Sequence, residues 1–256
     1  YFHKLYKIVC PVKNIYLLSI IFSFLFSTNY AQTTVTETFT GGSNYTYLGT
    51  SSNESTATQF WNGVDDDDAP GLRYISGATG SDYTGPSAGY GGSGWYVYAE
   101  ASSNSNETYA IESDVFTGTV THFSFYYHMY GTNIPNGALV VKSSTNSGTS
   151  WTTLLTIDEQ QHDSSSESWT QATAGSGSGS LAFTAVPSGT NKLRIEVKTG
   201  SSFKSDSAID HIVVTYATGP SISVGSAITG LDYILGSGPS TSQSTTVSGS
   251  SLEADI

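Results

Sequence analysis

An acidic residue, Asp210, stands within SDSAIDHIVV (205–214), an apolar run with the composition of a β-strand. A carboxylate among apolar neighbours is costly unless it is hydrogen-bonded or bound to a cation. Because side chains alternate along a strand, we expect Asp210 to share a face with Ala208 and Ile212, and His211 to take the opposite face. Asp210 is therefore a candidate metal ligand or a buried, hydrogen-bonded acid, and both interpretations stay open.

The other acidic residues give little support for catalysis. The segment DEQQHD (158–163) holds neighbouring acids, but glycoside hydrolysis needs two carboxyl groups on opposite sides of a sugar. Asp158 and Glu159 are adjacent and point apart in an extended chain. The sequence has no HExxH motif, and we interpret His128 and His211 as strand histidines rather than metal ligands. We predict no catalytic residue in this chain.

The elements that must position these residues are strands. Short apolar or alternating runs recur from residue 33 onward, separated by Gly, Ser, Asn and Thr, and helical periodicity is almost absent. This pattern predicts an all-β fold, a jelly-roll β-sandwich. The expected strands cover 35–42, 94–100, 109–116, 121–129, 138–143, 151–157, 192–199 and 208–216.

The overall charge excludes one class of partner. The 256 residues include 9 Lys and Arg against 21 Asp and Glu, for a formal net charge of −12. Nucleic-acid binding depends on clustered cations that contact phosphates, so we expect no nucleic-acid partner. Hydrophobic residues make up 37% of the chain, which is enough to form a folded core.

The N-terminal segment 1–31 has the layout of a secretory signal peptide. Lys4, Lys7 and Lys13 precede an apolar run at 15–25, and small residues follow up to Ala31. The alternative is an uncleaved membrane anchor, although the run is shorter than the roughly 20 residues that a spanning helix needs. We expect a secreted or cell-surface protein, with any membrane contact arising only through export or anchoring. Cys10, the only cysteine, lies in this segment, so we expect no disulfide in the mature domain.

A boundary is expected near residue 218, where the segment TGPS follows the last predicted strand. We therefore divide the chain into a signal peptide (1–31), a jelly-roll domain (32–217) and a linker with the truncated start of a second β-module (218–256). The strand-like spacing of VSGSSLEADI (247–256) favours a module. A disordered Ser/Thr-rich tail is the alternative.

Aromatic side chains supply the candidate binding surface. In THFSFYYHMY (121–130), alternation sends one set toward the core: Phe123, Phe125, Tyr127 and Met129. The opposite face carries Ser124 and the candidate ligand contacts Tyr126, His128 and Tyr130. The loop YTGPSAGY (83–90) offers a second rim through Tyr83, together with Trp95. The alternative is that these rings only stabilise neighbouring strands.

Several segments taken together resemble the MAM domain, the extracellular jelly-roll module of meprins and receptor tyrosine phosphatases. They occur in the family's order between residues 36 and 216: FWNGVDDDDAPGLRY (60–74), YTGP (83–86), GWYVYAEAS (94–102), AIESDVF (110–116), FSFYYHMYG (123–131), ALVVKSS (138–144), SWTTL (150–154) and SDSAIDHI (205–212). Two features depart from the family: the paired cysteines are absent, and His211 replaces the second acid of AIDDI. The N-terminal segment and the 247–256 segment resemble those of secreted multidomain proteins of Bacteroidetes.

The resemblance implies a non-catalytic adhesion or recognition module that binds a glycan or a cell-surface protein. Such modules often hold a calcium ion where the first and last strands meet, and calcium takes six to eight oxygen ligands. Glu37 and Asp210 are the expected ligands, with Asp67 of the DDDD run (65–68) as a further one. A solvated acidic loop is the alternative for that run. The alternative function is an accessory N-terminal domain of a secreted nuclease, protease or glycosidase.

Overall fold

The computed structural model describes residues 31–48, 60–64, 71–174, 181–182 and 185–219, together with 221–224, 233–234, 238–239, 244 and 246–250. The chain divides into two compact units, one of residues 32–219 and one of 1–31 with 220–256. The signal-peptide prediction for 1–31 falls almost entirely outside the described residues and stays a prediction. No helix in the described ranges has the length and apolar character needed to cross a membrane.

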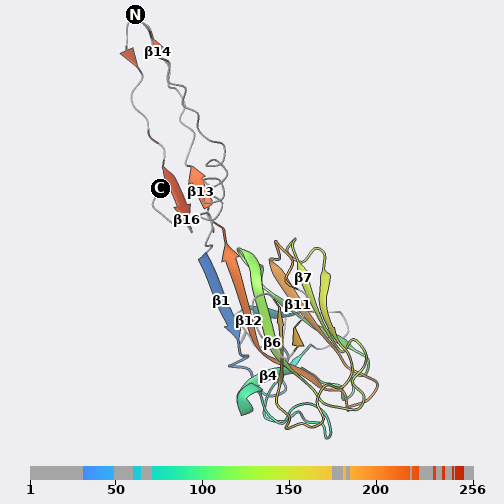
Figure 1. Ribbon diagram of the computed structural model, residues 1–256. Coiled ribbons are helices and arrows are strands. Elements are labelled where there is room, and N and C mark those ends of the chain that lie inside the picture. The colour runs from blue at the N-terminus through green and yellow to red at the C-terminus, as the bar shows by residue number, and fades with distance from the viewer. Residues whose placement is uncertain are drawn as a thin grey trace, which may run out of the picture. The chain divides into compact units, whose positions relative to one another are not determined.

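The larger unit contains two sheets. The first is seven-stranded, in the order β10-β9-β6-β12-β4-β3, with β1 also paired to β12. Figure 1 shows β1, β12 and β6 side by side. The strands are β1 (Ala31–Glu37), β3 (Arg73–Ser76), β4 (Trp95–Ala99), β6 (Thr119–Met129), β9 (Thr170–Ala174), β10 (Leu181–Ala182) and β12 (Ser207–Thr218).

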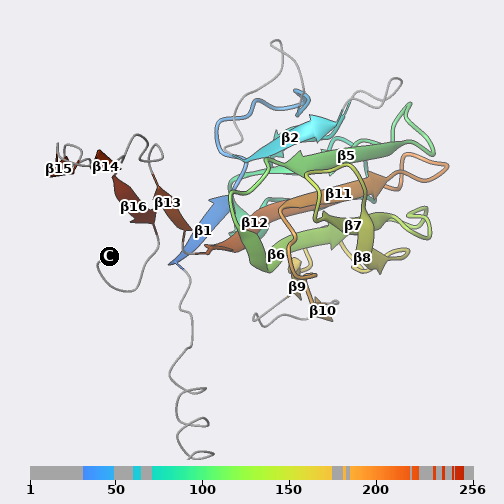
Figure 2. The same ribbon diagram turned by 90° about the horizontal axis from the view of Figure 1, so that it is seen from above.

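The second sheet is five-stranded, in the order β2-β5-β11-β7-β8, and all its pairings are antiparallel. Its strands run next to one another across the upper part of Figure 2. They are β2 (Trp61–Val64), β5 (Thr108–Ser113), β7 (Leu139–Ser144), β8 (Thr152–Ile157) and β11 (Lys192–Lys198). Together the two sheets confirm the predicted all-β sandwich.

The main core consists of the inward-facing residues of both sheets. Phe123, Phe125, Tyr127 and Met129 of β6 are all buried there, as the alternation along that strand predicts. The five-stranded sheet contributes alternating residues such as Leu193, Ile195 and Val197 of β11. Trp61 stacks on Phe123 with ring centres 6.1 Å apart, which joins the two sheets. Burying each such large side chain contributes roughly 1.5–3 kcal/mol.

The opposite face of the seven-stranded sheet is also covered at one end. A small second cluster there contains Ile75, Tyr96, Tyr98 and Ala208, with Trp169 packed against it. Two loops supply the cover, because the Tyr96 hydroxyl donates to the Gly77 carbonyl (2.7 Å) and the Trp169 indole donates to the Ala88 carbonyl (3.0 Å). The sheet is therefore a platform on which loops are fixed.

The predicted alternation of side chains around Asp210 is wrong after that residue, because β12 contains a β-bulge. The pairing of β12 with β6 shifts register between Asp210 and Val213, and His211 has a positive φ of 47°. The extra residue of a bulge reverses the phase of the faces that follow it. Ile212 therefore packs in the main core while Ala208 packs in the second cluster, so the two do not share a face.

In the second unit, the structure describes two small antiparallel sheets. One pairs β13 (Ser221–Val224) with β16 (Val247–Ser250), and the other pairs β14 (Tyr233–Ile234) with β15 (Gly238–Pro239). The strand at 247–250 lies where strand-like spacing was predicted. That 218–256 begins a second β-module stays a prediction.

Candidate functional site: a pocket between two loops

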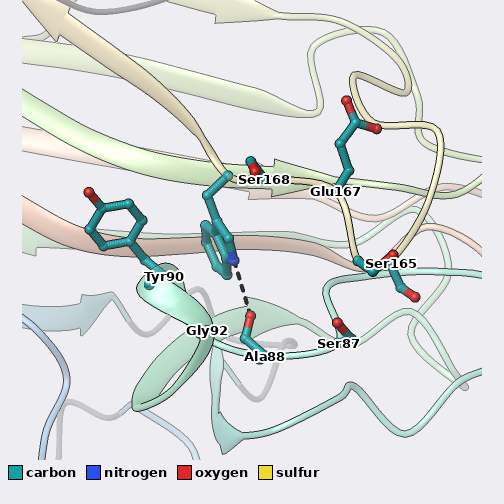
Figure 3. Close-up of a pocket in the computed structure, with 11 residues that line it drawn as sticks. Ser87, Ala88, Tyr90, Gly92, Ser165, Glu167 and Ser168 are labelled. Carbon is teal, nitrogen blue, oxygen red and sulfur yellow. Dashed lines mark hydrogen bonds between the residues drawn. The ribbon is translucent and has the colours of Figure 1, made fainter.

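Two loops enclose a pocket of about 310 Å³ above the second cluster. The first loop joins β3 to β4 and ends in a 3-10 turn at Tyr90–Gly92. The second joins β8 to β9. Figure 3 shows Ser87, Tyr90 and Gly92 on the first loop and Ser165, Glu167 and Ser168 on the second. The full lining is Ser87, Ala88, Gly89, Tyr90, Gly91, Gly92, Ser165, Ser166, Glu167, Ser168 and Trp169.

Direct bonds join the two loops. The Ser87 amide donates to the Ser165 carbonyl (2.7 Å), and the Trp169 indole donates to Ala88, as the dashed line in Figure 3 marks. Trp169 also meets the ring of Tyr96 edge-on at 5.4 Å between ring centres. These contacts fix the width of the pocket, so its walls are preformed.

Asp210 holds the aromatic side of the pocket in place. Its Oδ2 accepts the Tyr90 amide (2.9 Å) and its Oδ1 accepts the His211 amide (2.6 Å). The Tyr90 ring then stacks on Tyr126, with ring centres 3.6 Å apart and planes 24° apart. Burial, more than the nearby charge of Glu37, raises the pKa of Asp210 to about 7, although the two amides oppose the shift. Asp210 is thus a positioning residue for Tyr90.

The predicted calcium ligands lie partly within the described residues. Glu37 is buried at the end of β1, where its Oε1 accepts the Phe39 amide (2.7 Å), and its charge reaches Asp210. A carboxylate oxygen can accept more than one bond, so a bond to a backbone amide does not by itself prevent either acid from binding a cation. The donor chemistry fits calcium, with the remaining oxygens left to backbone carbonyls. Asp67 lies outside the described residues, among which no cluster of three or more His, Cys, Asp or Glu forms a metal site.

The structure separates the predicted ligand-binding residues. Tyr126 joins Tyr90 beside the pocket, and Tyr130 is half-buried. Trp95 is partly buried and packs against the main core, and its role at a binding rim stays a prediction. Tyr83 is 68% exposed in a loop and contacts Lys204 instead.

His128 is a correction, because it does not lie on an open face. It is fully buried, and its ring stacks on His162 with centres 4.2 Å apart and planes 16° apart. The loop that carries Trp169 covers the strand there, and sequence alternation alone cannot show such a cover. Burial, helped by the charge of His162, lowers the pKa of His128 to about 3.

The prediction of no catalytic residue overlooked one sequence motif. GPSAG (85–89) matches the G-x-S-x-G pattern of a nucleophile elbow. That elbow requires a strand-turn-helix context, whereas Ser87 lies in a loop followed by a single 3-10 turn. The nearby His162 is already engaged, since its Nδ1 accepts the Met129 amide (3.0 Å) and its Nε2 lies 3.2 Å from the Thr170 hydroxyl. The match therefore carries no catalytic assignment.

Comparison with known families decides the family. Residues 54–217 match the model of the MAM domain, meprin/A5/mu. The chain belongs to the MAM domain family. The match includes both pocket loops and Asp210 but not Glu37, and it confirms the resemblance drawn from the sequence segments. MAM modules are typically extracellular, and membership favours a non-catalytic binding module as the general function.

Solved structures with a similar arrangement are distant. The K2 cleaved adhesin domain of Lys-gingipain matches with a TM-score of 0.47 and 19% identity, over 73% of this chain and 98% of that one. The K3 adhesin domain of Lys-gingipain from Porphyromonas gingivalis matches with a TM-score of 0.40 and 15% identity, over 72% and 99%. The CBM22-1–GH10 modules of Clostridium thermocellum xylanase 10B, complexed with xylohexaose, match with a TM-score of 0.37 and 13% identity, over 72% and 28%.

The sequence analysis considered 158–163 of the second loop but did not single out the part that lines the pocket, 165–169. Trp169 stands in SESWT, outside every predicted strand, and its neighbours are serines of the kind found in any surface loop. Its partner Ala88 is 81 residues away in sequence. One available signal was the presence of a large aromatic residue within a Ser-rich loop, since such residues are enriched at binding sites.

Proposed function

We propose that this MAM module is an extracellular, non-catalytic recognition domain that binds a neutral glycan in the pocket between its two loops. The observation that carries the proposal is the make-up of the pocket: the aromatic residues Tyr90 and Trp169 line it together with serines and glycines. Its volume lies at the lower end of ligand pockets, which are roughly 300–1,000 Å³.

The pocket chemistry matches a sugar. The C–H face of a pyranose packs on an aromatic ring, and its hydroxyls need donors and acceptors at short range. Tyr90 offers the ring, Ser165 and Ser168 offer hydroxyls, and Glu167 at the rim accepts. Among the residues that the structure describes, no Lys or Arg lines the pocket, so an anionic sugar would meet the carboxylate of Glu167 there. A neutral ligand is therefore favoured over an acidic one.

Binding is tested by presenting the protein to an array of neutral oligosaccharides and titrating the best binder by calorimetry. Tyr90→Ala is expected to weaken binding about threefold to tenfold, the effect of losing roughly 0.5–1.5 kcal/mol of ring contact. Tyr45→Ala is the matched control, because Tyr45 is an exposed tyrosine that does not line the pocket. Binding to a protein partner with no response to any glycan would contradict the proposal.

We also propose that Glu37 and Asp210 hold a structural calcium ion. A ligand that binds only the folded state at about 100 times its Kd adds roughly 2.7 kcal/mol, which raises the melting temperature by about 5–11 °C in a domain of this size. Calcium added after EDTA treatment should produce this rise in the wild type and not in Glu37→Gln. An equal rise in both proteins would place the ion elsewhere.

The accessory-domain alternative is compatible with this binding role. A glycan-binding module attached to a secreted hydrolase would show the same pocket and the same response to Tyr90→Ala. That alternative remains a prediction.

A further inference from the structure

A second group of exposed side chains lies outside the pocket. Tyr83 is 68% exposed and Phe203 is 45% exposed, and both rings contact the same lysine. The Lys204 ammonium lies 5.0 Å from the ring centre of Tyr83 and 5.7 Å from that of Phe203. We refer to Tyr83, Phe203 and Lys204 as the aromatic–lysine cluster.

The cluster stands on a fixed base. Next to Tyr83, the buried Thr84 hydroxyl accepts the Asp206 amide (2.8 Å) and donates to the Tyr130 carbonyl (3.0 Å). The Lys204 carbonyl accepts the Asn133 amide (3.0 Å). The loops are thus held by buried bonds although the side chains above them are exposed. Binding to such a surface loses little backbone entropy.

Close packing at Gly131 leaves no room for a side chain between the segments that contain Thr84, Gly131 and Lys204. A Cβ at Gly131 would lie 2.5 Å from the Lys204 carbonyl oxygen and 2.7 Å from the Thr84 hydroxyl. The φ of Gly131 is +148°, which favours glycine. The Gly131 backbone therefore packs directly against the Lys204 carbonyl and the Thr84 hydroxyl, which holds the segments next to Tyr83 and Lys204 in place.

The ammonium of Lys204 is available to a ligand. Within the described residues, the other cations except Lys198 pair with glutamates: Arg73 with Glu100, Lys142 with Glu196, and both Lys192 and Arg194 with Glu112. Lys198 and Lys204 form no ion pair within the described residues, where the Lys204 ammonium lies over the rings of Tyr83 and Phe203. An exposed cation–π contact contributes about 0.5–1 kcal/mol, so stability gives little reason to expose two aromatic rings.

We propose that the aromatic–lysine cluster is a second binding site, separate from the pocket, that recognises an acidic glycan through its hexuronic acid units. A hexuronate joins an apolar ring face to a carboxylate on the same small unit. Its face packs on Tyr83 or Phe203, and its carboxylate pairs with the Lys204 ammonium. The two sites then discriminate by charge, because the described lining of the pocket contains Glu167 and no Lys or Arg, whereas the cluster contains Lys204.

The test titrates the whole protein with oligomers of galacturonic acid, with EDTA present because these oligomers bind calcium. Lys204→Gln is expected to weaken binding about fivefold, which corresponds to an exposed ion pair of roughly 1 kcal/mol. Tyr83→Ala should weaken it about threefold to tenfold through the lost ring contact. Lys198→Gln is the matched control and should leave binding unchanged.

The same oligomers as methyl esters separate charge from shape. We expect the affinity of the wild type for the esters to equal the affinity of Lys204→Gln for the acid oligomers. Tyr90→Ala should leave the affinity for the acid oligomers unchanged, because Tyr90 belongs to the pocket. Absence of binding to the acid oligomers, or an affinity insensitive to Lys204→Gln, would overturn the proposal. Equal binding of oligoglutamate with the same dependence on Lys204 would also overturn it, since the occupant would then be an acidic peptide. None of these three outcomes bears on the neutral ligand of the pocket.

Discussion

His128→Phe is expected to gain stability relative to the wild type as the pH falls from 7 toward 4. His128 is fully buried against His162, and burial lowers the pKa of His128 to about 3 from an ordinary value of 6.5. Between pH 3 and pH 6.5, the folded and the ordinary pKa of this side chain, His128 is protonated in the unfolded chain and neutral in the folded chain. The unfolded state therefore binds more protons, and the stability contributed by this site is lost as the pH falls below 6.5.

The size of the effect follows from one proton. Over the range where only the unfolded state is protonated, the wild type should lose about 1.4 kcal/mol per pH unit relative to His128→Phe. Burial also lowers the pKa of His162, so part of the acid sensitivity remains in the variant. Phenylalanine keeps an aromatic ring against His162 and Trp169, which limits the cost of the substitution at pH 7.5.

The measurement is the difference in the free energy of unfolding between the two proteins at several pH values. The wild-type curve alone is not diagnostic, because burial raises the pKa of Asp206 and of Asp210 to about 7. These acids bind protons in the folded state between about pH 4 and 7, so they add stability on acidification and oppose the histidines. A difference that stays constant from pH 7.5 to pH 4.5 would contradict the assignment of His128 as a buried, neutral side chain.

Gly200→Ala is expected to destabilise the domain by about 3 kcal/mol or more, which corresponds to a fall in melting temperature of about 6–12 °C. A Cβ at this position would lie 1.9 Å from the carbonyl oxygen of Asn133, so the backbone itself must move. The amide of Gly200 also donates to the Ser205 hydroxyl (2.9 Å), inside the turn that leads to Asp206 and β12. The strain therefore falls on the base of the loop that carries Lys204.

Gly80→Ala is the matched control for this substitution. Its Cβ would find its nearest neighbours 3.8 Å away on the Tyr45 ring, an ordinary contact. Urea denaturation of both variants should show the loss for Gly200→Ala and less than about 0.5 kcal/mol of change for Gly80→Ala, as for most surface substitutions. Equal stability of the two variants would show that the 130–134 and 200–206 loops do not meet as described.

The strands with clear alternation could be predicted from the sequence, and those shaped by distant contacts could not. β6 from Phe123 onward and β11 alternate with a two-residue period, so these strands and their core-facing side chains follow from the sequence. The predicted strand at 35–42 was displaced, because β1 ends at Glu37. β2, β3, β9 and β10 were missed, since each is five residues or fewer and is defined by its partner across the sheet.

The site was less predictable for the same reason. Asp210 stood out in the sequence as an unusual acid, yet its main partner, the Tyr90 amide, is 120 residues earlier and belongs to a loop. The bulge at His211 changed which side chains share a face of β12. No residue type near His211 predicts a bulge. The burial of His128 depends on the 162–169 segment, whose His162 and Trp169 rings lie against it. The alternation of residues within one strand does not indicate whether a distant loop packs over that strand.

The most direct test of glycan binding in the pocket is an NMR titration of the isotope-labelled protein with neutral hexasaccharides of glucose, mannose and xylose. The indole N–H of Trp169 is a sensitive reporter, because it lines the pocket and donates to Ala88 between the two loops. We predict concentration-dependent shifts of this resonance and of the Gly89–Gly92 amides with at least one of the three sugars, and none at Lys204. Shifts confined to residues outside the two loops, or no shift with any neutral sugar, would contradict the assignment of the pocket as a glycan-binding site.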